Sequence, residues 1–255
     1  MSYIIELILA LNDNYVPILI RNNKALVVDP AEFKPVVQFL ENNNIEDVEI
    51  WNTHHHFDHV GANLELKDRY SAIIRGHLKD KYRLPGLTDL FNIGDTLMFQ
   101  DLEANVLDFS GHTLGHVGFY FSDINVAFVG DHLFSMGCGR LFEGTAQQMY
   151  DGFELMKNTF NNETLIYCAH EYTEANARFA LTVDKENLDL KHRYEGVLNA
   201  RQNKQATVPF KFGDELKTNP FLRVHKENIQ QSLGLSKDCS HVACFKELRK
   251  RKDSF

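Results

Sequence analysis

The 255-residue chain carries a formal net charge of −8, with 44% hydrophobic and 24% charged residues. This composition is that of a globular protein, and its acidic balance argues against a general nucleic-acid binder, which normally carries a basic surface. No apolar run approaches the roughly 18–20 residues that a membrane helix requires, so we expect no membrane span. The N-terminal residues show no basic stretch followed by an apolar core, and four cysteines do not make a disulfide framework in a chain this long. We therefore expect reduced thiols and a cytoplasmic protein.

The chain opens with predicted strands. Apolar or alternating runs, separated by Asn-rich turns, lie at residues 3–11, 15–20 and 24–28. Asp29-Pro30 ends the third of these strands, the apolar spacing of residues 33–43 predicts a helix, and residues 48–51 predict a buried strand. The segment 53–59 follows directly, on the kind of loop that commonly carries ligands.

A predicted helix at 62–70 and a strand at 71–74 lead into a second series of strands. Its members lie at 96–99, 102–109, 117–121 and 126–129. A helix at 145–160, with Thr145 as its N-cap, and a strand at 164–168 complete this part. The order of elements predicts two sheets with helices packed outside them.

The pattern changes after residue 170. Residues 172–204 are rich in Ala, Leu, Asn and Lys without strand alternation, and residues 226–233 and 239–252 also favour helix. We expect a catalytic domain at 1–170 and a helical domain at 171–255. No low-complexity linker separates them, so we expect them to pack closely.

The segment Thr53-His54-His55-His56-Phe57-Asp58-His59 concentrates metal-binding side chains. Imidazoles suit zinc and iron, and a carboxylate among them suits a site that also holds water. Solvated surface histidines or a chance histidine run are the alternatives, but neither explains the inserted Asp. The i, i+2 spacing of His54 and His56 lets an extended segment aim both rings to the same side.

Three later residues, His112, Asp131 and His170, also follow predicted strands and lie among small, turn-forming residues. The candidate ligands are then His54, His56, Asp58, His59, His112, Asp131 and His170. This number is too large for one tetrahedral ion and suits two ions. The Asp131 carboxylate, with its two oxygens, is the natural bridge, and His55 is left as a spacer.

The segment 53–59 matches the T-H-x-H-x-D-H signature of the metallo-β-lactamase superfamily, and the later ligand positions match in order. Within that superfamily the whole chain resembles the glyoxalase II (hydroxyacylglutathione hydrolase) family. The matching segments are Gly130–Phe134, Gly137–Gly144, His170–Thr173, Asn219–Arg223 and Arg249–Asp253. The resemblance implies an α+β fold, in which a four-layer αββα sandwich is followed by a smaller all-helical domain that binds glutathione.

The resemblance also implies a ligand set and a reaction. It assigns His54, His56 and His112 to a first metal, assigns Asp58, His59 and His170 to a second, and makes Asp131 the bridge. We expect two divalent ions per chain, zinc first, with iron or manganese as alternatives that mixed ligands also accept. The implied reaction is hydrolysis of S-(2-hydroxyacyl)glutathione, typically S-D-lactoylglutathione, to D-lactate and glutathione in methylglyoxal detoxification. A hydroxide bridging the ions would attack the thioester, with Asp58 and Asp131 as catalytic carboxylates.

For the substrate, the resemblance implies contacts from Arg140, Phe142, Tyr172, Arg249 and Lys252. Residues 236–255 hold six basic and three acidic side chains. Such a tail is often only a solvated helix end, but the resemblance favours glutathione binding here. Phe142 stands where some members carry Tyr, which removes a hydrogen bond.

One departure from the family pattern is His132, which stands where Thr is usual. This extra imidazole beside Asp131 could support the ligands or perturb the metal preference. Because the ligand set is already complete without it, we expect the ring to point away from the metals.

Other functions are less compatible with the sequence. A glutathione-persulfide dioxygenase of this fold uses one iron and fewer ligands, and another hydrolase of the fold, such as a β-lactamase or a lactonase, would lack the basic helical tail. A non-catalytic metal-binding or scaffold protein would be expected to have lost ligands. We expect a monomer that acts on a small molecule, with no nucleic-acid or membrane partner. The sequence leaves open the metal and the range of acyl groups.

Overall fold

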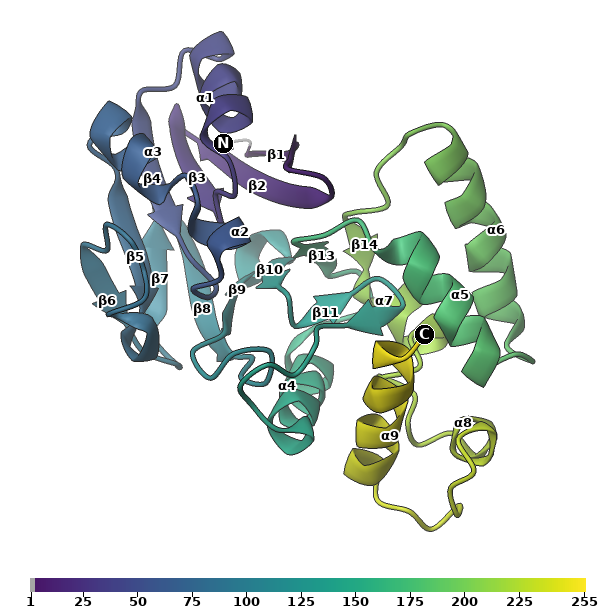
Figure 1. The fold of residues 1–255 in the computed structure, drawn as a ribbon. Coiled ribbons are helices and arrows are strands. Elements are labelled where there is room, and N and C mark those ends of the chain that lie inside the picture. The colour runs from purple at the N-terminus through teal and green to yellow at the C-terminus, as the bar shows by residue number, and fades with distance from the viewer. Residues whose placement is uncertain (1–2) are drawn as a thin grey trace. The chain divides into compact units, whose positions relative to one another are not determined.

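The computed structural model describes residues 3–255, whose internal contacts group them into two compact units (Figure 1). Unit 1 contains the described residues up to Asp108, together with Thr113–Gly130. Unit 2 contains Phe109–His112 and Asp131–Phe255. The expected domains at 1–170 and 171–255 remain a prediction.

Unit 1 contains a six-stranded sheet in the order β1-β2-β3-β4-β5-β6. Its strands are β1 (Ile4–Ala10), β2 (Asn14–Arg21), β3 (Lys24–Val28), β4 (Asp47–Trp51), β5 (Ile73–His77) and β6 (Asp89–Phe91). β1, β2 and β3 pair antiparallel, whereas β3 to β6 pair parallel. Parallel strands end at the same edge of a sheet, so the segments that follow β3 and β4 start side by side. One of them begins at Asp29 and the other at Asn52.

Helices cover one face of this sheet. They are α1 (Phe33–Asn42) and α3 (Asn63–Tyr70), and the short helix α2 (Phe57–Val60) directly precedes α3. Val36 and Leu40 of α1, one turn apart, lie in a single apolar cluster with Leu66 of α3 and with Val27 and Ile50 of the sheet. Burial of a side chain of this size stabilises the fold by about 1.5–3 kcal/mol.

Four further strands of unit 1 pair antiparallel in the order β10-β9-β8-β7. They are β7 (Thr96–Phe99), β8 (Leu102–Asp108), β9 (Val117–Phe121) and β10 (Val126–Gly130). The Trp51 ring of β4 stacks with Phe121 at 5.8 Å and lies 5.1 Å from Phe119. These contacts pack the two groups of strands face to face, so the layers of unit 1 are helix, sheet and sheet.

The first part of unit 2 consists of a short hairpin, a helix and a strand. The hairpin is β11 (Leu133–Phe134) and β12 (Gly137–Cys138), the helix is α4 (Ala146–Thr159), and the strand is β13 (Leu165–Cys168). A capping box confirms the predicted N-cap of α4: the Thr145 side chain accepts from Gln148 N, and the Gln148 side chain accepts from Thr145 N. This pair satisfies two backbone donors at the start of the helix.

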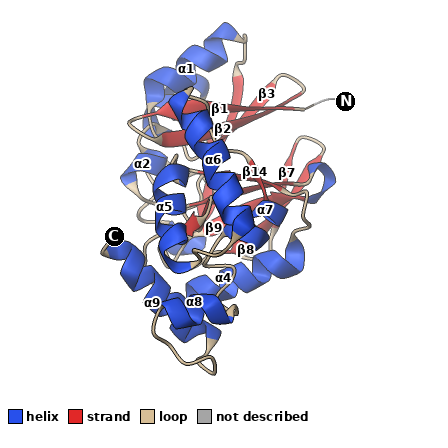
Figure 2. Cartoon of the chain, turned by 90° about the vertical axis from the view of Figure 1, so that its right-hand side faces the viewer, coloured by secondary structure: helices blue, strands red, loops and turns tan. Residues whose placement is uncertain are grey.

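The tail of unit 2 is helical, as predicted. Its helices are α5 (Thr173–Val183), α6 (Leu188–Gln202), α7 (Phe212–Thr218), α8 (Glu227–Ser232) and α9 (His241–Asp253). α5 and α6 lie side by side in both views (Figures 1 and 2). Phe221 lies 5.3 Å from Phe245 of α9, and Phe245 lies 5.4 Å from Phe153 of α4. These rings form the apolar contact between α9 and α4.

One short strand interrupts the tail that we expected to be all helical. β14 (Phe210–Lys211) pairs antiparallel with β13, with Phe210 opposite Ile166. The pairing joins segments more than forty residues apart, so local sequence pattern does not reveal it. None of the helices formed by residues 3–255 has the length and apolar character that a bilayer-spanning segment requires.

Candidate metal centre

The histidine-rich segment of unit 1 leaves β4 extended and then turns into α2. His56 has an extended backbone (φ −62°, ψ 146°) and directly precedes α2, which carries Asp58 and His59. The change of conformation separates two pairs of candidate ligands. His54 Nε2 lies 3.0 Å from His56 Nδ1, and His59 Nε2 lies 3.6 Å from Asp58 Oδ2.

Both distances fit ligands of a shared ion. Metal bonds of about 2.0–2.1 Å in tetrahedral geometry place two donor atoms about 3.3 Å apart. The donors are neutral imidazoles and one carboxylate, which are the ligand types of zinc, iron and manganese sites. Unit 1 therefore offers two pairs of donors with the right chemistry and spacing.

A buried carboxylate, Asp29, orients the rings of this segment. It accepts hydrogen bonds from Thr53 N at 2.7 Å and from the Thr53 hydroxyl, and its Oδ2 lies 3.0 Å from His59 Nδ1. Thr53 Oγ1 in turn lies 3.0 Å from His54 Nδ1. Such partners fix which ring nitrogen carries the proton and leave the other nitrogen, Nε2, facing the ligand side.

Asp29 is the residue that sequence reasoning missed. Asp29-Pro30 was interpreted only as the end of a strand, yet Asp29, His54 and His59 offer donor atoms within 4.8 Å of one another. Local sequence pattern does not reveal this contact, which depends on the parallel pairing of β3 with β4. That pairing brings the ends of both strands to one edge of the sheet. Asp29 has a left-handed backbone, with φ of 51°, which Asp tolerates better than most residues do.

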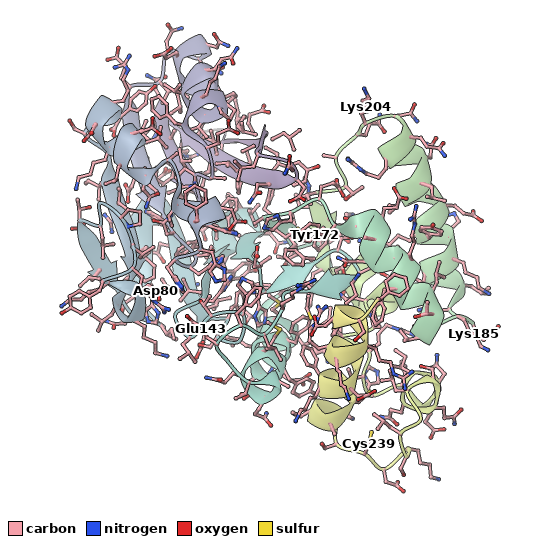
Figure 3. All side chains as sticks on the ribbon, viewed as in Figure 1. Asp80, Glu143, Tyr172, Lys185, Lys204 and Cys239 are labelled. Atoms are coloured by element: carbon pink, nitrogen blue, oxygen red, sulfur yellow. The ribbon has the colours of Figure 1, made fainter. Side chains whose placement is uncertain are left out.

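His55 is more than the expected spacer. Its Nδ1 lies 3.4 Å from Oδ2 of Asp80, a buried carboxylate labelled in Figure 3 that also pairs with Arg83. Burial opposes the charged form, but the His55 ring and the Arg83 guanidinium outweigh it and hold the pKa of Asp80 below its ordinary value. This contact ties the middle of the histidine segment to the 3-10 helix Leu78–Asp80.

Unit 2 brings together the other three candidate ligands. Asp131 Oδ2 lies 3.4 Å from His112 Nε2, and Asp131 Oδ1 lies 3.4 Å from His170 Nε2. The far nitrogen of His112, Nδ1, lies 2.9 Å from the Arg140 carbonyl oxygen, to which it can donate. All three ligand side chains are buried, and each carboxylate oxygen faces a different imidazole.

The ring of His132 packs among aromatic side chains. It stacks on Phe109 at 4.6 Å and lies 5.0 Å from Phe153, and its Nδ1 lies 3.0 Å from the Phe109 carbonyl oxygen. This arrangement accounts for the unusual residue: the imidazole fills an apolar layer and hydrogen-bonds the backbone that leads to His112.

Two of the predicted substrate contacts have exposed rings. Phe142 is 61% exposed and lies edge-on to His112 at 5.1 Å. Tyr172, labelled in Figure 3, immediately precedes α5, and its ring stacks on His170 at 4.7 Å. Unit 2 therefore places one accessible aromatic ring beside each of its two candidate histidine ligands.

The predicted cationic contacts differ in accessibility. Arg249 is buried, donates from Nη1 to the Cys138 carbonyl at 2.7 Å, and pairs with Asp253 at 3.0 Å. The Arg140 side chain is 65% exposed, and its Nε lies 3.9 Å from the same Asp253 carboxylate. Burial, and then the nearby Arg249 charge, hold the pKa of Lys252 below its ordinary value. These three cations gather near the end of α9.

The cysteines beside the candidate ligands are poor nucleophiles. Burial raises the pKa of Cys138 to about 11 and also raises the pKa of Cys168. The thiolate is the reactive form, so both side chains act as small apolar groups at neutral pH.

Known proteins match this chain over its whole length. A family model described as "Metallo-beta-lactamase superfamily" matches residues 15–170, and one described as "Hydroxyacylglutathione hydrolase C-terminus" matches residues 171–255. A hydroxyacylglutathione hydrolase from Trichodesmium erythraeum is 45% identical, over 96% of this chain and 97% of that protein. Another, from Methylococcus capsulatus, is 43% identical over 96% of each chain.

Solved structures show the same fold. ETHE1 from Myxococcus xanthus superimposes with a TM-score of 0.67 at 19% identity, covering 98% of this chain and 99% of that chain. The BLEG-1 B3 metallo-β-lactamase gives a TM-score of 0.66 at 20% identity, covering 86% of this chain and 99% of that chain. The fold is that of the metallo-β-lactamases, followed by a helical C-terminal region.

Proposed function

This chain belongs to the hydroxyacylglutathione hydrolase family, and from that premise we propose that it hydrolyses S-(2-hydroxyacyl)glutathione to the 2-hydroxy acid and glutathione. The expected substrate is S-D-lactoylglutathione, which gives D-lactate. The observation that carries this proposal is the arrangement in unit 2. There, one carboxylate, Asp131, faces two imidazoles, and the same unit carries a cluster of cations.

The proposed centre holds two divalent ions. His54, His56 and His112 would hold the first, Asp58, His59 and His170 the second, and Asp131 would bridge them. Support comes from donor spacings of 3.0–3.6 Å inside each unit and from the outer partners that orient the rings. Zinc suits these ligands, and iron and manganese also accept them.

The chain's own residues organise the reaction around this centre. When bound, paired divalent ions lower the pKa of water and polarise a carbonyl group. Asp58, which accepts a hydrogen bond from Asn14 Nδ2 at 3.1 Å, would orient the attacking water. The thiolate of glutathione is a good leaving group, so a strong general acid is not required. No cysteine is expected to act as the nucleophile, because burial raises the pKa of both Cys138 and Cys168 and so disfavours the reactive thiolate.

Glutathione carries two carboxylates, so its binding requires local positive charge in an acidic protein. Arg140, Arg249 and Lys252 would supply this charge, with Arg140 and Lys252 more exposed than Arg249. Tyr172 and Phe142 would line the path from this cluster to the ligands. Phe142 offers only its ring, because it lacks the hydroxyl that Tyr would provide.

We also propose that the protein acts as a monomer in the cytoplasm. The proposed substrate contacts all lie in one unit of one chain, so no second copy is needed to complete them. The four free cysteines suit a reducing compartment. Light scattering of the purified protein would test the monomer.

The function is tested by combining metal analysis with turnover. The purified protein should contain close to two divalent ions per chain and should cleave S-D-lactoylglutathione, with loss of the thioester absorbance and release of free thiol. The main alternative is a glutathione-persulfide dioxygenase. One iron per chain, with oxygen consumption on glutathione persulfide and no thioester cleavage, would establish that alternative instead.

A further inference from the structure

The hairpin β11–β12 lies in the chain between two proposed active-site residues, Asp131 and Arg140. At its base, Gly139 N donates to the His132 carbonyl at 3.3 Å, so the two ends of the hairpin lie against each other. A Cβ atom added at Gly139 would come within 1.9 Å of the Asp131 carbonyl oxygen, so only glycine allows this approach. The carbonyl oxygen of the next residue, Arg140, lies 2.9 Å from His112 Nδ1 and can accept a hydrogen bond from it. The base of the hairpin therefore sets the position of both Asp131 and His112.

Asn219, which directly follows α7, hydrogen-bonds both strands of this hairpin. Its side-chain nitrogen lies 2.9 Å from the Gly137 carbonyl oxygen and 3.2 Å from the Phe134 carbonyl oxygen. The same nitrogen lies 2.9 Å from Glu215 Oε2. Asn219 is 0% exposed, so these hydrogen bonds are buried. One amide group thus connects both strands of the hairpin to α7.

Glu215 holds the turn of the same hairpin. Its Oε2 accepts a hydrogen bond from Met136 N at 2.8 Å, and Met136 has a left-handed φ of 55°. The buried carboxylate is balanced by Arg193, whose Nη2 lies 2.6 Å from Oε1 and also donates to Ser135 Oγ at 3.0 Å. Removing either member of a buried ion pair is strongly destabilising, because the other charge is left buried without a partner.

We propose that Asn219 and Glu215 are positioning residues for the metal centre, acting on Asp131 and His112 through the β11–β12 hairpin. This inference rests on the proposed function only in taking Asp131 and His112 as metal ligands. It gives a role to the segment Asn219–Arg223, which the sequence resemblance singles out without assigning it one. The helical region then serves the ligands as well as the substrate.

The test compares metal retention at matched stability. Asn219→Ala removes the amide and leaves two buried carbonyls without their donor, whereas Ile229→Ala truncates a buried apolar side chain of α8 in the same unit. Both variants should lower Tm. Asn219→Ala should also bind metal about 10–100-fold more weakly in chelator competition, as expected when groups behind the ligands are removed. Ile229→Ala should bind metal within about twofold of wild type.

A second variant covers the case in which Asn219→Ala does not fold. Glu215→Gln keeps the volume of the side chain and removes its charge, and it should show the same loss of metal affinity. A positioning role also predicts that added metal raises the Tm of either variant less than that of wild type. Metal retention equal to that of Ile229→Ala at equal loss of Tm would overturn the proposal. These measurements need no substrate, so a wild-type protein that binds two ions but leaves the thioester intact would contradict the proposed function alone.

Discussion

Replacing Asp29 by Asn should loosen the histidine segment of unit 1. The carboxylate accepts from Thr53 N at 2.7 Å and from the Thr53 hydroxyl, and it lies 3.0 Å from His59 Nδ1. An amide offers only one acceptor oxygen, so at least one of these buried donors loses its partner. Asn tolerates the left-handed φ of 51° as Asp does, so the change alters hydrogen bonding without adding backbone strain.

The magnitude follows from the number of donors that lose their partner. Each buried donor left without a partner costs about 1–3 kcal/mol. Either orientation of the amide leaves one or two of the donors without an acceptor. We therefore expect the free energy of unfolding to fall by roughly 1–6 kcal/mol. Because Asp29 orients His59 directly and His54 through Thr53, metal affinity should fall by about 10–100-fold.

The assay is urea unfolding of the metal-depleted protein, followed by chelator competition and turnover of the metal-loaded protein. Glu41→Gln is the matched control, because Glu41 forms an exposed ion pair with Arg69 in the same unit. The control should leave metal affinity and turnover unchanged. If Asp29→Asn unfolds within about 0.5 kcal/mol of wild type and keeps its metal affinity, then Asp29 does not orient the ligands.

Three further predictions concern the ligands, the substrate contacts and the thiols. Asp131→Ala should lose bound metal and activity together, as measured by elemental analysis and turnover, and full occupancy in this variant would argue against a bridge. Lys252→Ala should raise KM more than it lowers kcat, because the contact is remote from the reacting thioester. For wild type, KM should begin to rise at a pH below the ordinary lysine pKa of 10.5, because the lowered pKa of Lys252 removes its positive charge at a lower pH. Lys252→Arg should shift that rise to higher pH. A KM profile that is the same in both proteins would refute the contact. Alkylation at pH 7 should leave Cys138 unmodified and activity intact, since its pKa is about 11, and mass spectrometry of the treated enzyme would reveal any failure.

The sequence predicted the features that depend on local pattern. The histidine segment was found because its ligand types are contiguous and directly follow an apolar strand, β4. The N-cap of α4 was predicted at Thr145, and the structure adds the capping box that Thr145 forms with Gln148. The family resemblance then supplied the fold, which the structural matches show independently.

What the sequence could not predict depends on pairing between distant segments. β11, β12 and β14 are each two residues long and exist because of their partner strands, so no run of alternation marks them. Asp29 and Asn219 carry no signal of their own, since Asp and Asn before Pro are common in turns. Only the fold shows that Asp29 reaches His59 and that Asn219 reaches the β11–β12 hairpin.

The candidate ligands of both units are oriented in the same way. In His54, His59 and His112, the nitrogen that faces away from the neighbouring ligand already has a partner: Thr53, Asp29 or a backbone carbonyl. The rings are therefore ordered when the chain folds, so metal binding does not bear the entropic cost of ordering them. Variation should then be tolerated where a side chain lies outside these contacts. His132 fits this rule, because its ring lies in an aromatic layer and its Nδ1 lies 3.0 Å from a backbone carbonyl oxygen, that of Phe109.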